Sequence, residues 1–120
     1  MTPYQRLEAW HFCHELVLLV YRLTATWPVH ERYGLAGQAR RAAISIPTNL
    51  AEGSARRGPR EFRRHIDIAL GSLSELTYLL QLARDLGYLS PKDFAEVEEV
   101  RDRAGRVTWR LYQANSGATR

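Results

Sequence analysis

One apolar series constrains the fold of this chain more than any other feature. Its members are spaced alternately by four and three residues, and they are Phe62, Ile66, Ala69, Leu73, Leu76, Leu80 and Ala83. This heptad spacing places all of them on one face of an α-helix. Pro59 suits the first turn of such a helix, and Gly87 suits a left-handed cap after its end. The pattern therefore predicts a helix over residues 59–87.

A second apolar series precedes the first and predicts a helix over residues 31–52 that stops at Gly53. Pro47 lies inside this helix. Proline removes one backbone donor and clashes with the preceding turn, but the apolar period continues beyond it. We therefore expect a kink at Pro47 rather than a helix end.

Two further helices are indicated at the ends of the chain. A helix over residues 5–27 should be ended by Pro28. Ser90 followed by proline is typical of a helix start, and a long apolar stripe then predicts a helix over residues 90–115. Residues 116–120 should fray.

These segments predict an all-α fold, namely one up-down-up-down antiparallel four-helix bundle that forms a single domain over residues 1–120. A chain of 120 residues with 45% hydrophobic content can bury a core without disulfides, and its single cysteine, Cys13, excludes an intrachain bridge. No apolar run approaches the ~20 residues of a membrane span, and no signal-peptide pattern is present. We expect a cytoplasmic protein that does not associate with membranes.

The run Leu16–Tyr21 contains six consecutive apolar residues. At about 100° per residue they surround the helix, so the core of one bundle cannot bury them all. An exposed patch of this size is rare on a monomer. We therefore expect a homo-oligomer whose interface includes Leu18 and Tyr21.

The phrase QARRAAISIPTNLAEG over residues 38–53 resembles the signature of the bacterial four-helix bundle proteins first noted in intervening sequences of 23S rRNA genes. LEAW over residues 7–10 and ALGSLSEL over residues 69–76 also resemble that family. The chain is more remotely similar to the accessory bundle proteins of diversity-generating retroelements, which work with a reverse transcriptase and nucleic acid. The resemblance implies a small non-enzymatic bundle that assembles as a ring-like homopentamer, with RNA or DNA as a suspected partner.

Nine residues of these phrases are candidates for a structural role. They are Arg41, Ser45, Pro47, Asn49, Glu52, Gly53, Gly71, Ser72 and Glu75. If the two central helices form a hairpin that turns near Arg56, positions whose numbers sum to about 112 face each other. Arg41 would then lie opposite Gly71, and Gln38 opposite Ser74 or Glu75.

Small residues at Ala42, Ala43 and Gly71 would let the two backbones approach closely. Arg41 and Glu75 would fall within reach of each other, either as an ion pair that sets the register of the helices or as the lining of a ligand cleft.

Glu52 places a carboxylate at the C-terminal end of the second predicted helix, where the helix dipole disfavours it. It should be bound by the next helix N-terminus, by Arg56 or by a neighbouring subunit. A local cap, a contact across an oligomer interface and direct ligand chemistry all remain open for this residue.

No constellation of catalytic residues is apparent. Glu8 and His11 have the Glu-x-x-His spacing of a di-iron bundle, but the motif occurs once and such a centre needs two copies. Cys13 fits core packing better than nucleophilic catalysis. We therefore expect no enzyme activity, metal, cofactor or small-molecule substrate. Most aromatic residues fit core or interface packing, and Tyr33 and Tyr88 near helix ends are weak candidates for base stacking.

Charge is concentrated in one segment. Residues 40–64 contain seven arginines against two glutamates, a net of +5, whereas the whole chain carries +4. Five of these arginines flank the turn between the central helices and are the candidate nucleic-acid-binding residues: Arg56, Arg57, Arg60, Arg63 and Arg64. Guanidinium groups suit bidentate contacts with phosphate.

Other interpretations of the same arginines stay open. They could form a solvated helix face, bind an acidic protein partner, or pair with the acidic segment of residues 93–102 in a neighbouring chain. Two functions from different classes follow: an oligomer that binds the RNA or DNA backbone, and a structural or protein-interaction module without intrinsic nucleic-acid binding.

Overall fold

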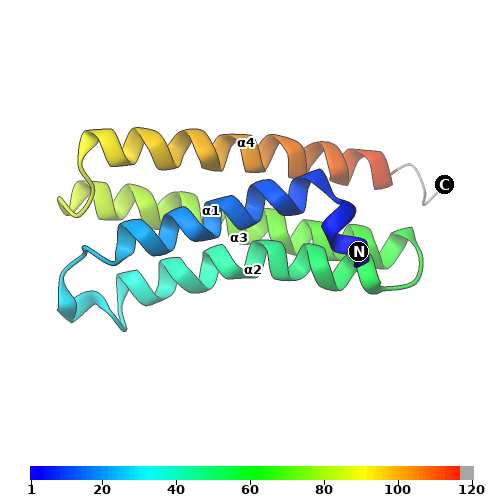
Figure 1. The fold of residues 1–120 in the computed structure, drawn as a ribbon, viewed down its shortest axis with the longest axis horizontal. Coiled ribbons are helices and arrows are strands. Elements are labelled where there is room, and N and C mark those ends of the chain that lie inside the picture. The colour runs from blue at the N-terminus through cyan, green and yellow to red at the C-terminus, as the bar shows by residue number, and fades with distance from the viewer. Residues whose placement is uncertain (117–120) are drawn as a thin grey trace.

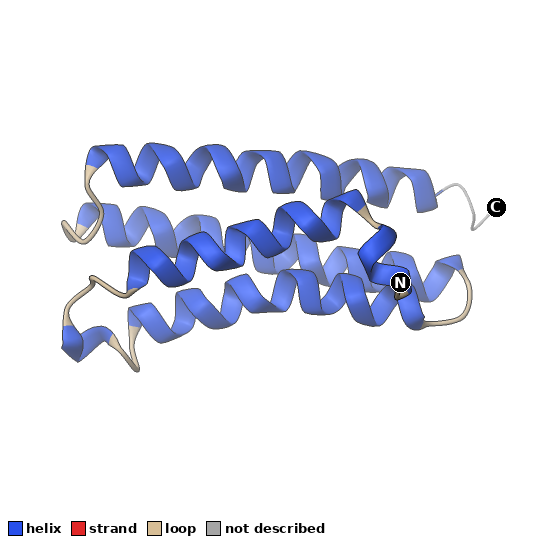
Figure 2. Cartoon of the chain, viewed as in Figure 1, coloured by secondary structure: helices blue, strands red, loops and turns tan. Residues whose placement is uncertain are grey.

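The computed structural model describes residues 1–116. Its elements are four long helices, α1 (Glu8–Thr24), α2 (Leu35–Ala55), α3 (Pro59–Asp85) and α4 (Pro91–Ser116), and two 3-10 turns, η1 (Pro3–Arg6) and η2 (Val29–Glu31). No strand occurs among the described residues, so the predicted all-α class is confirmed (Figure 2). The predicted fraying falls largely on residues 117–120, which lie outside the described residues.

The helices lie along one long axis in a body of 47 × 24 × 23 Å. Figure 1 shows each helix running back beside the one before it, with the connections at alternate ends. The packing is most extensive between α2 and α3, and α1 and α4 close the arrangement by packing against each other. Each helix therefore contacts two neighbours around one shared core.

The core is built from the apolar stripes of all four helices. The largest fully buried hydrophobic side chains are Leu16, Val20, Ile46, Leu50, Ile66, Leu76, Leu80 and Val97. Every member of the heptad series in α3 is buried except Phe62, which is half-buried against the core. Within residues 1–116, no helix is both long and apolar enough to cross a membrane.

The predicted bounds of the first helix, 5–27, were too wide at both ends. The backbone N–H and the Oγ1 of Thr2 each donate to Oε1 of Gln5 at 2.8 Å, which winds η1 as a separate turn. Leu7 then has extended backbone angles, so α1 starts only at Glu8. At the other end α1 stops at residue 24, and Trp27 is buried beyond it.

The prediction for the second helix, residues 31–52, began and ended too early, since α2 spans Leu35–Ala55. Glu31 belongs to η2, and its Oε1 accepts a hydrogen bond from the Leu35 N–H at 3.0 Å, so it caps α2 from outside instead of starting it. The helix also continues past Gly53 to Ala55. It runs through Pro47 without ending, as predicted, while the kink there stays a prediction.

The ends of α3 and the start of α4 were predicted more accurately. α3 begins at Pro59 as expected and ends two residues before the predicted limit. Gly87 follows in the left-handed region with φ of 83°, and the N–H of Tyr88 reaches back to the Ala83 carbonyl at 2.9 Å. Ser90 Oγ accepts the N–H of Asp93 at 3.0 Å, which confirms the predicted start of α4.

Candidate functional site

The five arginines predicted to bind nucleic acid lie together at one end of the bundle, and we call them the basic turn. Arg56 and Arg57 lie in the connection between α2 and α3, and Arg60, Arg63 and Arg64 lie in the first two turns of α3. All are exposed except Arg63, which is half-buried. The unpaired N–H groups at the start of α3 add a partial positive charge to this end of the molecule.

Two members of the basic turn are engaged in ion pairs. Arg56 Nη2 lies 3.7 Å from Oε2 of Glu52, and Arg64 Nε lies 3.3 Å from Oε2 of Glu61. The hydrogen bond and charge of Arg64 lower the pKa of the Glu61 carboxyl. Of the three partners considered for Glu52, namely the next helix N-terminus, Arg56 and a neighbouring subunit, the structure shows Arg56.

Arg57 and Arg60 are different, because neither has a salt bridge or side-chain hydrogen bond to any residue within 1–116. Both guanidinium groups face solvent and keep their full hydrogen-bonding capacity. Arg60 and Tyr112 also line a shallow groove of about 270 Å³ where the start of α3 meets the end of α4. The basic turn therefore presents free cations beside a concave surface.

Three of the nine signature residues, Ser45, Asn49 and Ser72, belong to a hydrogen-bonded chain between α2 and α3. The Oγ atoms of Ser45 and Ser72 lie 2.8 Å apart, and Asn49 Nδ2 donates to the Ser45 carbonyl at 2.8 Å and to its Oγ at 3.1 Å. Asn49 Oδ1 lies 3.2 Å from Nδ1 of His65, which donates to it. The chain ends near Arg64, whose Nη2 is 3.4 Å from His65 Nε2. A structural network thus leads from the middle of the bundle to the basic turn.

His65 was missed in the sequence analysis, although it is buried and central to this network. The hairpin rule that pairs positions on α2 and α3 places Asn49 opposite Arg63, two residues before its actual partner His65. The same rule correctly placed Gln38 opposite Glu75, since Nε2 of Gln38 donates to Oε2 of Glu75 at 3.3 Å.

The role predicted for Gly71 was wrong. A Cβ added at Gly71 would meet nothing within 4 Å, so this glycine allows no close approach of backbones. Gly53 has that role instead, because a Cβ there would lie 2.6 Å from the Cβ of His65. Ala42 and Ala43 are buried, while a close approach of the two backbones at these residues stays a prediction.

The predicted pairing of Arg41 with Glu75 is also wrong. Arg41 is exposed and has no salt bridge or side-chain hydrogen bond among residues 1–116. Its Nη1 approaches Gly37, one turn earlier in its own helix, instead of α3. The hairpin rule sets the level of a residue along the axis, but the rotation of α2 points this side chain outward.

The predicted interface residues are exposed on α1. Leu18 retains 58% and Tyr21 41% of its accessible surface, while Leu16, Leu19 and Val20 in the same run are buried. The run therefore divides between core and surface, as expected of a helix that is apolar on all sides. The Arg40 guanidinium lies 4.8 Å above the Tyr21 ring and covers part of it.

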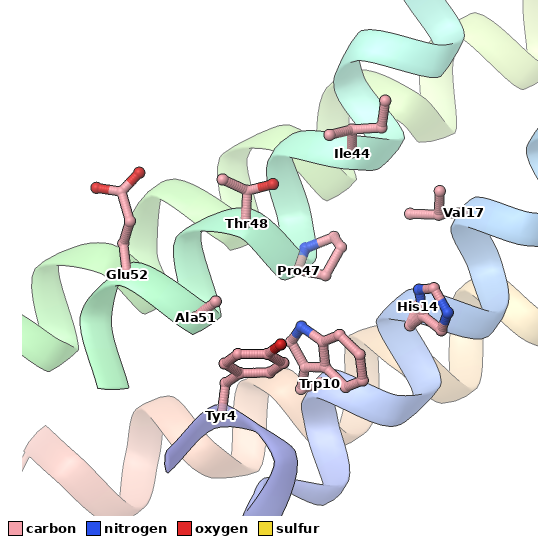
Figure 3. Close-up of a pocket in the computed structure, with 9 residues that line it drawn as sticks. All are labelled: Tyr4, Trp10, His14, Val17, Ile44, Pro47, Thr48, Ala51 and Glu52. Atoms are coloured by element: carbon pink, nitrogen blue, oxygen red, sulfur yellow. The ribbon is translucent and has the colours of Figure 1, made fainter. Parts of the chain in front are cut away.

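An apolar groove of about 400 Å³ lies between α1 and α2, whereas Leu18 lines another groove between α1 and α4. Figure 3 shows Trp10 and His14 of α1 opposite Pro47 of α2, with Ile44 above them. The Trp10 and His14 rings stack with centroids 5.0 Å apart. Two signature residues, Pro47 and Glu52, thus line a surface groove.

Four of the five acidic side chains in residues 93–102 are paired within their own chain. Glu96 forms a two-pronged contact with Arg22 at 2.9 Å, Glu98 contacts Arg101 at 2.9 Å, and Glu99 lies 3.5 Å from Arg103. The arginines in these three pairs belong to α1 and α4, and not to the basic turn.

His11 and Cys13, which were considered as a metal ligand and a nucleophile, both contact other residues of the bundle. The ring of His11 contacts the Gln5 carbonyl at 2.7 Å. Cys13 is fully buried, and burial raises the pKa of its thiol to about 11 despite a hydrogen bond with Thr108. Among residues 1–116, no three His, Cys, Asp or Glu side chains gather in a way that could hold a metal ion.

The two tyrosines considered for stacking differ. Tyr33 is 88% exposed, whereas Tyr88 donates its hydroxyl to Oε2 of Glu31 at 2.9 Å and packs beside Trp27. Tyr88 therefore joins the connections at the end of the bundle opposite the basic turn.

A comparison with curated proteins finds no match for this chain. A comparison with protein families finds one, because the model of the 23S rRNA-intervening sequence protein matches residues 5–109. That match spans all of α1, α2 and α3 and most of α4. This match covers most of the chain, including the signature residues Ser45, Asn49 and Ser72 that are hydrogen-bonded between α2 and α3, and the chain belongs to the 23S rRNA-intervening sequence protein family.

Proposed function

We propose that this protein is a non-enzymatic, oligomeric helical bundle of the cytoplasm that binds the backbone of RNA or DNA through the basic turn. One observation carries the proposal: Arg57 and Arg60 are exposed cations without an ion-pair partner in residues 1–116, in a segment of net charge +5. Their positions beside the N-terminus of α3 add the helix dipole to the same field. Contacts of this kind recognise phosphate and carry no base information.

Oligomerisation is the second part of the proposal. Leu18 and Tyr21 are exposed apolar residues on α1, and the same helix carries Trp10 and Val17 of the apolar groove shared with α2. The family resemblance implies a pentamer, and five copies of the basic turn on one ring would bind a single polyanion together. Avidity of this kind raises the overall affinity well above that of one site.

The nucleic-acid proposal is tested by the salt dependence of binding to short RNA and DNA oligomers. The double variant Arg57→Ala, Arg60→Ala should bind more weakly, and its log–log salt slope should flatten by roughly 0.7 to 0.9 for each phosphate that the variant no longer neutralises. Arg32→Ala, Arg41→Ala is the matched control, because it removes two exposed arginines far from the basic turn. Equally weakened binding in the two variants would assign binding to net charge alone, and unchanged binding in both would refute the proposal.

The oligomer is tested by light scattering of Leu18→Glu, which should have a lower mass than the wild type while it keeps its helical circular dichroism. Leu86→Glu is the control, since Leu86 is also exposed but lies at the end of α3. A wild-type mass of one chain would refute this part.

The second candidate function is a protein-interaction module, for example an accessory subunit for a reverse transcriptase, and the apolar groove between α1 and α2 favours it. It becomes the better account if the oligomer forms but no nucleic acid binds at any salt concentration.

A further inference from the structure

One exposed aromatic residue close to the basic turn has no role in the core. Trp109 lies on α4 and keeps 50% of its accessible surface, although its neighbours Val107 and Thr108 are buried. Its indole stacks on the ring of Tyr112, with centroids 5.5 Å apart and planes 21° apart. We call this pair of rings the platform, and it lies next to the end of the bundle that carries the arginines.

The platform lies on a continuous depression between α3 and α4. Tyr112 lines the groove that contains Arg60, and Trp109 lines a second groove of about 580 Å³ farther along the same two helices. Asp67 lines both grooves, so they adjoin. A ligand that contacts the basic turn can thus reach Trp109 without leaving the depression.

The second groove is shaped by small residues. Gly71, Ser74 and Gly105 line it, and a Cβ added at Gly71 would meet nothing within 4 Å. Space is therefore open beside the Trp109 ring. Gly71 and Ser74 belong to the signature phrase in α3, so this inference gives Gly71 a role that close helix packing does not.

The charges along the depression separate two kinds of contact. Arg60 is free for phosphate, whereas the cation of the second groove, Arg101, is held by Glu98 at 2.9 Å and by Asp102 at 3.0 Å. The Asp67 carboxylate lies between the two parts and repels phosphate. The region around Trp109 thus favours an uncharged planar group over a second length of backbone.

We infer that Trp109 is a stacking platform for an unpaired base, so that the nucleic acid bound at the basic turn is single-stranded. Stacking on an aromatic face needs a base whose own face is free, which a single strand offers and the interior of a duplex does not. This inference rests on the proposed function, because the basic turn must first hold the phosphates. Beyond that function, it specifies that the bound nucleic acid is single-stranded and that Trp109 selects this form.

The test compares three probes of equal length: a single-stranded RNA oligomer, the corresponding duplex, and an abasic single strand. The wild type should bind the single strand more tightly than the other two. Trp109→Leu should weaken single-strand binding by roughly 5- to 150-fold, the range for one stacked base, and leave duplex and abasic binding unchanged. Tyr33→Leu is the matched control, because Tyr33 is a more exposed aromatic residue at the other end of the bundle.

Intrinsic fluorescence provides a second measurement that does not depend on a variant of the platform. Trp27 is buried, so a strand that stacks on Trp109 should quench the emission while the abasic strand should not. A Trp10→Phe background keeps the third tryptophan from contributing. Equal quenching by both strands would overturn the inference.

The outcomes separate this inference from the proposed function. If Trp109→Leu binds the single strand as tightly as the wild type while Arg57→Ala, Arg60→Ala does not, base stacking is refuted and backbone binding stands. Equal wild-type affinity for single strand and duplex has the same meaning. If the wild type binds none of the three probes, both proposals fail.

Discussion

The Cβ that an alanine at position 53 would introduce lies only 2.6 Å from the Cβ of His65, and Phe62 approaches it to 3.0 Å. α2 and α3 therefore lie in close contact beside Gly53. His65 cannot swing away, because its Cβ is attached directly to the backbone of α3 and its ring is held by Asn49.

Gly53→Ala should therefore destabilise the fold by about 1–3 kcal/mol, the usual cost of overpacking a tight contact. Gly71→Ala is the matched control: it lies in open space within a helix, so it should raise stability by roughly 0.5–1 kcal/mol. Urea denaturation of the two variants gives the comparison. A stabilising Gly53→Ala would contradict the contact with His65.

Asn49→Ala should cost about 1–3 kcal/mol, because it leaves Nδ1 of the buried His65 without its acceptor. Thr48→Ala, next to it but exposed, should change stability by less than about 0.5 kcal/mol. Thermal unfolding of both variants tests the network. Matching melting temperatures would mean that water replaces Asn49.

Arg41→Ala and Arg57→Ala should have nearly the same stability, each within about 0.5 kcal/mol of the wild type. Both side chains are exposed and lack ion pairs within residues 1–116. This reverses the expectation that follows from a buried pair with Glu75. The denaturation midpoints of the two variants test this expectation. A markedly lower midpoint for Arg41→Ala would support the pair of Arg41 with Glu75.

The connection between α1 and α2 should make stability sensitive to acid. Hydrogen bonds from the Leu35 N–H and from the Tyr88 hydroxyl lower the pKa of the Glu31 carboxyl in the folded chain. The unfolded chain then binds a proton that the folded chain does not, so the contribution of Glu31 is complete above an ordinary pKa of about 4.3 and is lost as pH falls through the lowered value.

Glu31→Gln should remove that contribution. Its urea midpoint should lie below that of the wild type at pH 7, and the difference should shrink as the pH is lowered through the range in which Glu31 is protonated. Glu15→Gln, on the exposed face of α1, serves as the control. A difference that stays constant with pH would show that the charge of Glu31 has no part in capping α2.

Cys13 should be inert in the native protein. Its side chain is fully buried and its pKa is raised to about 11, so only about one thiol in a thousand would be ionised at pH 8 even with access. A thiol reagent should label it at the rate of unfolding, and at once in denaturant. Rapid labelling without denaturant would mean that α1 and α4 separate readily, since Thr108 of α4 covers this sulfur.

The helices and several of their ends could be predicted, because apolar periodicity and capping residues act over short stretches of sequence. The seam of α3, the cap at Gly87 and the start of α4 at Ser90 each depend on residues within a few positions of one another. The predicted helix bounds were wrong where a side chain from outside the helix forms hydrogen bonds at or near its first residue. Glu31 caps α2 without belonging to it, and Thr2 with Gln5 winds a separate turn before α1.

The candidate site was only partly predictable. The charge of the basic turn is visible in the sequence, and so is the spacing of three and four residues that pairs Arg64 with Glu61 and Arg56 with Glu52. The ring contact between Trp109 and Tyr112 is local to α4, but the grooves beside the two rings are lined by residues of α3 and depend on how the two helices pack.

Periodicity and charge along the chain are enough to predict four amphipathic helices, an α1 that is apolar on more sides than one core can cover, and positive charge at one turn. The packing of the helices is needed to see that Gly53, and not Gly71, is a point of close approach, and that Arg41 points away from Glu75. The physical reason is that periodicity orients residues around one helix axis. How far each helix is rotated against its neighbour depends on the packing of side chains from all four.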